Sequence, residues 1–136
     1  MRIAVVAIAA LLFATSCNKK NDYKEITNDP FLYSKTVKEL NNVVMQNNFA
    51  PIVASRNYVY ANIAAYEVIA AGNPTQYQSL AGQLNDLGTM PVPPAGKEID
   101  FNFAAILAFC KLGEAVTFPE GSMEEYVDSL KKLVKN

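Results

Sequence analysis

Apolar residues occupy almost every position of residues 51–72 and leave no continuous polar face. Pro51 suits the first turn of a helix, where its missing N–H is not needed, and Gly72 suits the left-handed residue just past a helix end. A helix that is apolar on all sides is surrounded by other helices rather than lying on a surface. The pattern therefore predicts a buried helix, interrupted strongly by only four side chains: Arg56, Asn57, Asn62 and Glu67.

One-sided apolar stripes predict a helix before this segment. Asp29-Pro30 is typical of a helix start, because the carboxylate caps free N–H groups and proline fits the first turn. From there to about Gln46, one stripe is formed by Phe31, Val37, Leu40, Val44 and Met45.

Similar patterns predict three helices after it, over about 74–88, about 98–116 and from Ser122 onward. Ser122 and Glu125 have the spacing of a capping box. Strand-like alternation and hairpin turns are absent from the sequence. The prediction is an all-α domain over 29–136, with about five helices packed as a partial helical bundle.

The N-terminus has the pattern of a bacterial lipoprotein signal peptide. Met1-Arg2 is positive, the apolar run is too short to span a bilayer comfortably, and small residues lead to Cys17 before the chain turns polar. We expect residues 1–16 to be cleaved, Cys17 to carry lipid and residues 17–28 to form a tether. The chain would then be anchored to a membrane of the bacterial cell envelope, at its periplasmic or outer-membrane face. The alternatives are an ordinary secretory signal and, fitting the short run less well, a membrane-spanning anchor.

Composition narrows the possible functions. About 120 residues follow the signal peptide, which is enough for one small domain. The net charge of −1, without a long Lys/Arg run, argues against nucleic-acid binding. Cys110 lies in an apolar run, where an inert buried thiol is expected. Acidic clusters at 98–100 and 124–128 fall at helix starts, where carboxylates complement the helix dipole, so we expect no metal site.

The phrase PIVASRNYVYANIAAYE within 51–67 resembles a core helix near the start of bacterial proteins in the vanadium-dependent haloperoxidase and type 2 phosphatidic acid phosphatase superfamily. The similarity extends over roughly residues 28–130. It implies an all-helical enzyme whose pocket binds vanadate or phosphate. In that superfamily the pocket is built from a Lys followed by Arg-Pro, a Pro-Ser-Gly-His segment, and a Ser-Arg pair followed by a His.

This chain lacks those segments in working form. It has no histidine, and its arginines are Arg2 and Arg56. The superfamily chemistry needs histidine as vanadium ligand or nucleophile and arginines for the oxyanion charge. Ser55-Arg56 followed by Asn62 has the spacing of the third segment, with Asn in place of His. Because that segment comes late in the superfamily and this helix comes early, we interpret the match as coincidence and expect no catalytic residue here.

The resemblance therefore implies an N-terminal helical portion of an envelope-tethered haloperoxidase or phosphatase. Catalytic residues, and any vanadate, would belong to a missing C-terminal part, whose helices are the expected partners. Arg56, Asn62 and Glu67 are then interpreted as buried structural polar residues with partners on other helices. Arg56 and Glu67 are about 16 Å apart along one helix face and cannot pair directly.

A second hypothesis is a complete small helical lipoprotein that binds a partner or ligand through apolar surface between its helices. The last residues, 133–136, stop within a helical pattern without a terminating Gly or Pro, which favours the first hypothesis. A truncated unit should also leave an apolar face exposed where further helices would dock.

Overall fold

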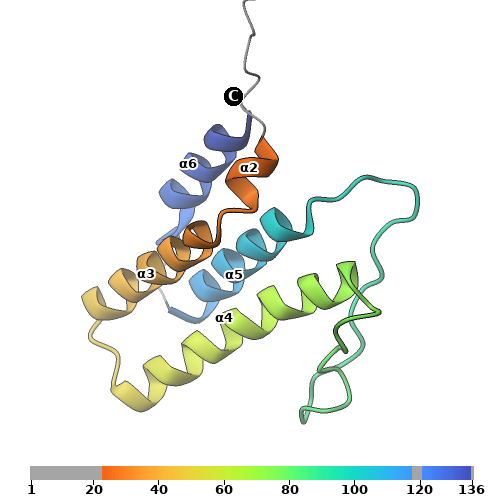
Figure 1. The fold of residues 1–136 in the computed structure, drawn as a ribbon. Coiled ribbons are helices and arrows are strands. Elements are labelled where there is room, and N and C mark those ends of the chain that lie inside the picture. The colour runs from red at the N-terminus through yellow and green to blue at the C-terminus, as the bar shows by residue number, and fades with distance from the viewer. Residues whose placement is uncertain (1–22, 118–120, 136) are drawn as a thin grey trace, which may run out of the picture.

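The computed structural model describes residues 23–117 and 121–135, which form five helices (Figure 1). The helices are α2 (Tyr23–Thr27), α3 (Pro30–Gln46), α4 (Pro51–Gly72), α5 (Phe101–Thr117) and α6 (Glu124–Lys135). Helix α5 is central and packs on α4 and on α3, while α2 lies beside α6. Apart from one isolated bridge between Ala81 and Leu84, these residues contain no β-structure. The all-α prediction is confirmed for the described residues.

Helix α3 starts as the sequence predicts and buries part of the expected stripe, namely Leu40 and Val44, with Val37 packed against the core. Pro30 is the first helical residue, and the Asp29 carboxylate accepts the Phe31 N–H at 2.9 Å. Phe31 and Met45, expected in the stripe, are about 70% exposed. The buried face is shifted from the expected one and includes a threonine; its residues are Leu32, Thr36, Leu40, Val43 and Val44.

Helix α4 runs antiparallel to α5, since Gly72 at its end lies on the Phe101 ring at the start of α5. A Cβ at position 72 would overlap that ring. Gly72 is itself helical, so the expectation of a left-handed residue after the helix was wrong. The close approach of α5 requires a glycine here. Earlier in α4, the face toward the core is lined by small residues: Ala54, Ala61 and Ala65.

Residues 73–100 form a long connection without a helix, so the predicted helix over 74–88 was wrong (Figure 1). Gly82 and Asp86 adopt positive φ of 78° and 64°, which interrupt a helix. The Leu80 N–H donates to the buried Glu67 carboxylate at 2.7 Å instead of to a helical carbonyl. A tertiary hydrogen bond therefore replaces the local one that the periodicity favoured.

Two further helix starts differ from expectation: α5 begins at Phe101 rather than at about residue 98, and α6 begins at Glu124. Asp100 caps α5 by accepting the Phe103 N–H at 2.9 Å, and its other oxygen accepts the Thr27 hydroxyl at 2.7 Å. Thr27 belongs to α2, which lies within the stretch expected to be a tether, and it is buried.

At α6 the capping box does not form. The helix begins at Glu124, and the Ser122 hydroxyl is buried without a described partner.

The core lies where α3, α5 and α6 meet. Leu40, Phe109 and Met123 are fully buried there, and Gly113 lets Leu40 approach α5 closely. A hydroxyl contact of 2.8 Å joins Thr36 of α3 to Tyr126 of α6. In the part of the chain that the structure describes, no helix has the length and apolarity needed to span a membrane.

Candidate functional site

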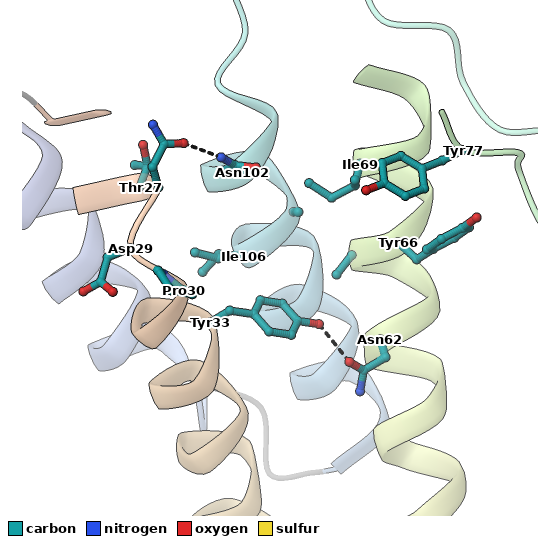
Figure 2. A pocket seen from close by; sticks show the side chains of 13 residues that line it. Thr27, Asp29, Pro30, Tyr33, Asn62, Tyr66, Ile69, Tyr77, Asn102 and Ile106 are labelled. Atoms are coloured by element: carbon teal, nitrogen blue, oxygen red, sulfur yellow. Dashed lines mark hydrogen bonds between the residues drawn. The ribbon is translucent and has the colours of Figure 1, made fainter. Parts of the chain in front are cut away.

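A pocket of about 570 Å³ opens between the start of α3, the middle of α4 and the start of α5 (Figure 2). Its inner wall is apolar and consists of Ala65 and Ile69 from α4 with Ala105 and Ile106 from α5. The rim is polar but mostly neutral. It is formed by side chains from four parts of the chain, among them Tyr33, Asn62, Tyr66, Tyr77 and Asn102.

The polar rim groups already bind one another. The Tyr33 hydroxyl donates to the Asn62 side-chain oxygen at 2.8 Å, as Figure 2 shows, and the Asn62 amide donates to the Tyr58 carbonyl at 2.8 Å. On the opposite side, the Asn102 amide donates to Asn28 at 2.6 Å. These bonds fix the rim of the pocket and link α3 to α4 and the segment before α3 to α5.

Two tyrosines form the wall on the side of the long connection. The rings of Tyr66 and Tyr77 meet edge to face with centroids 6.3 Å apart. The Tyr66 hydroxyl donates to the Gln78 carbonyl at 2.8 Å. An apolar pocket with aromatic walls and few polar groups is the usual form of a small-molecule site.

The pocket cannot neutralise an oxyanion. Its one charged lining residue is Asp29, whose carboxylate is negative and caps α3. Burial, followed by the nearby Cys110, raises the pKa of Tyr33, so its phenol stays neutral at physiological pH. Vanadate and phosphate need converging cations or N–H donors in a dry site. The residues present do not fit such a group.

A second groove of about 540 Å³ lies on the side of α4 that carries Ile63 and Val68. The proline-rich part of the connection, 90–94, covers one side of it, and Phe101 and Leu112 of α5 contribute to its wall. Its one charged lining residue is Glu67, whose two oxygens accept the Ser79 hydroxyl and the Leu80 N–H, each at 2.7 Å. The groove is therefore apolar, and its carboxylate is already satisfied.

The three residues expected to be buried polar groups lie in different surroundings. Glu67 is 6% exposed, but its partners belong to the connection rather than to another helix. Arg56 and Asn62 are exposed, so their expected burial was wrong for this chain. Asn62 takes part in the rim of the first pocket. Arg56 falls on the side of α4 opposite the buried alanines, and no described helix covers that side.

The sequence did not single out the tyrosines of the pocket. Tyr33, Tyr66 and Tyr77 come from two helices and the connection, and nothing in their spacing indicates that they meet. Asn57 is a further case. It is 5% exposed, and its side-chain nitrogen has no partner among the described residues.

Cys110 is fully buried in α5. Burial, and secondarily the charge of Glu114, raises the pKa of its thiol to about 12. A protonated, inaccessible thiol is inert. Within residues 23–117 and 121–135, no group of three or more His, Cys, Asp or Glu could hold a metal ion. Cys17 lies outside the described residues.

The chain is similar to the crystal structure of a bacterial vanadium-dependent iodoperoxidase, with a TM-score of 0.72 and 38% sequence identity. The match covers 76% of this chain and 25% of that chain, so this sequence spans about a quarter of the iodoperoxidase's length. No protein-family model matches this sequence. No curated protein matches it either. The described helices have a vanadium haloperoxidase-like fold.

Proposed function

We propose that this chain is a non-catalytic, N-terminal helical portion of an envelope-tethered protein of the vanadium haloperoxidase or phosphatase type. The proposal is supported by the similarity to a quarter of an iodoperoxidase, together with the absence of histidine from the sequence. The observation that carries it is that the described helices have the iodoperoxidase-like fold, while their first pocket contains no cation that could bind an oxyanion.

In this proposal the helices act as a structural support. Vanadate, where it is bound, is held by residues outside this sequence, and it supplies the oxyanion chemistry there. The contribution of this chain is a rigid pair of helices, α4 and α5, whose close contact at Gly72 and Phe101 fixes their relative position. Catalytic residues on other helices would be positioned by packing against this pair.

Activity assays on the purified chain test the proposal. With added vanadate, we expect no turnover of iodide or bromide with hydrogen peroxide, and no hydrolysis of phosphate esters. The physical reason is that developing oxyanion charge finds no converging donors in this chain. Turnover that exceeds a buffer control and copurifies with the chain would contradict the proposal.

The tether is a separate part of the proposal and rests on the sequence around Cys17. We expect Cys17 to be acylated and the mature chain to be held at a membrane of the cell envelope. Labelling with a radioactive fatty acid in a bacterial host tests this. Label that persists in Cys17→Ser would show that this cysteine is not the acceptor.

A ligand-binding module is the second candidate function, and the first pocket favours it. Its apolar wall and tyrosine rim suit an uncharged aromatic or amphipathic molecule. A screen of uncharged aromatic compounds by thermal shift would detect such binding. For this candidate, Tyr66→Ala should abolish the shift, whereas Tyr60→Ala, at an exposed site outside the pocket, should not.

A further inference from the structure

The face of α4 that points away from α5 is apolar, although no described helix covers it. At 100° per residue, Ile52, Val59 and Ile63 fall on the side opposite the alanines that contact the core. Ile52 is 83% exposed and Val59 is 53% exposed. The outward face of a helix packed on one side is normally polar. This pattern is typical of a helix with neighbours on both sides.

This outward face continues into the apolar groove beside the connection. Ile63 belongs to both, and the groove extends along α4 to Ala71. From Ile52 to Ala71 the track is about 28 Å long, the length of a helix of about 19 residues. This strip is apolar except at Arg56 and Glu67, and its length matches another helix better than a small molecule.

One charge lies in the middle of the exposed part of the track. Arg56 sits between Ile52 and Val59 on this face, and it has no hydrogen-bond or ion-pair partner among the described residues. Glu67, the other charged residue along the track, already accepts hydrogen bonds from the Ser79 hydroxyl and the Leu80 N–H. A docked apolar surface that covered Arg56 would bury an unpaired charge, which is strongly unfavourable. The partner must therefore bring a carboxylate.

We propose that the outward face of α4 docks an apolar helix that carries one carboxylate opposite Arg56. The helix belongs to the remainder of the haloperoxidase-like protein, so this inference rests on the proposed function. The iodoperoxidase chain, of which this sequence matches 25%, shows that this fold occurs within a larger molecule. The length of the track indicates that the partner is a helix, and Arg56 indicates that this helix carries a carboxylate.

Synthetic helical peptides of about 20 residues test the proposal. Three peptides share one Leu/Ala face and differ at its central position, which is Glu, Gln or Lys. We expect the Glu peptide to bind the full chain at least about tenfold more tightly than the Lys peptide, as found for close interfacial charge pairs. Fluorescence anisotropy with labelled peptides measures the affinity.

Charge exchange provides the matched control. Arg56→Glu should reverse the preference, so that the Lys peptide binds more tightly than the Glu peptide. Lys38→Glu makes the same change of charge at an exposed position of α3 and should leave the preference unchanged. Because Arg56 is exposed, neither variant should disturb folding, which circular dichroism would verify.

Several results would overturn the inference. The first two are that no peptide binds, or that binding does not depend on the charge at position 56. The other two are that the chain forms a stable dimer that buries Val59 against a second copy, or that this face binds phosphatidylglycerol vesicles instead of peptides. Failure of the proposed function is distinguishable, since it appears as turnover with vanadate in the activity assay. If the chain shows no turnover and binds none of the peptides, the docking helix is refuted and the proposed function is not.

Discussion

Glu67 is a buried carboxylate whose two oxygens hold the start of the long connection against α4. The Ser79 hydroxyl and the Leu80 N–H each donate to one oxygen. The same side chain thus explains why the segment after α4 is not helical. Two charge-assisted hydrogen bonds outweigh the weak local preference of a short amphipathic sequence.

Glu67→Gln should destabilise the protein. Glutamine offers one acceptor oxygen in place of two, so either Ser79 or Leu80 loses its acceptor. We expect the free energy of unfolding to fall by about 1–3 kcal/mol. Urea denaturation measures the change, and faster hydrogen exchange at the Leu80 amide would locate it. The control is Glu98→Gln, which removes a solvent-exposed ion pair with Lys24 and should cost less than about 1 kcal/mol.

Cys110 should resist alkylation in the native protein. Its pKa is raised from 9.0 to about 12, so at pH 8 the reactive thiolate is nearly absent. We expect no carbamidomethylation of the Cys110 peptide by iodoacetamide until the chain is unfolded, as measured by mass spectrometry. Modification of native protein at the rate of a free thiol would contradict this burial.

The same shift predicts the sign of a pH effect. A raised pKa means that the folded state retains its proton after the unfolded state has lost it. The contribution of Cys110 to stability is therefore complete below about pH 9 and is lost between about pH 9 and 12. Cys110→Ala should show a smaller loss of stability over this range. Besides burial, the charge of Cys110 also raises the pKa of Tyr33 and of Tyr126, so its removal lowers these pKa values and further reduces the loss of stability at high pH.

At the scale of elements, the packing of α4 on α5 depends on one missing side chain. Gly72→Ala should push Phe101 away and destabilise the pair by about 1–3 kcal/mol. Thermal unfolding followed by circular dichroism measures this. Gly88→Ala is a matched control, because nothing lies within 4 Å of a Cβ at that position and its φ is not positive. Equal effects of the two substitutions would disprove the close approach.

Helix ends were predicted well where local capping decides them. Asp29 and Pro30 define the start of α3, and Pro51 is the first residue of α4. Ser122 shows the opposite case. Its sequence fits a capping box, yet the turn at Gly121, with φ of 82°, leads into a helix that begins at Glu124. The hydrogen bond between the Gly121 N–H and Glu114 belongs to tertiary structure and could not be inferred locally.

At the scale of the whole molecule, the described surface carries several large apolar side chains. Ile52 and Val92 are more than 80% exposed, and Phe31 and Met45 about 70%. We expect the isolated chain to bind a dye specific for apolar surface and to self-associate at high concentration. The double variant Ile52→Gln/Val59→Gln should reduce both signals, while Lys35→Gln on the exposed side of α3 should not.

The opposite result has a defined meaning. A compact monomer that melts cooperatively and binds no dye would contradict the expectation of an exposed docking face. It would favour the ligand-binding module, in which the pocket between α3, α4 and α5 is the functional feature. Analytical ultracentrifugation and calorimetry on the same sample distinguish these outcomes.

The sequence alone determined the all-α class, the limits of α3, the start of α4 and the resemblance to haloperoxidases. The class and the helix limits depend on hydrophobic periodicity and on caps, which act between residues close in the chain, whereas the resemblance rests on the phrase PIVASRNYVYANIAAYE. It also showed that histidine is absent, which composition alone establishes.

Only the tertiary structure decided which faces are buried. The periodicity of α4 showed that every side is apolar, but not that α5 covers the alanine side while Arg56 stays exposed. Nor could spacing show that Tyr33, Asn62 and Asn102 meet around one pocket, or that Glu67 would capture residues 79–80. Such contacts join residues far apart in the chain, and their geometry is set by how the helices pack rather than by any local pattern.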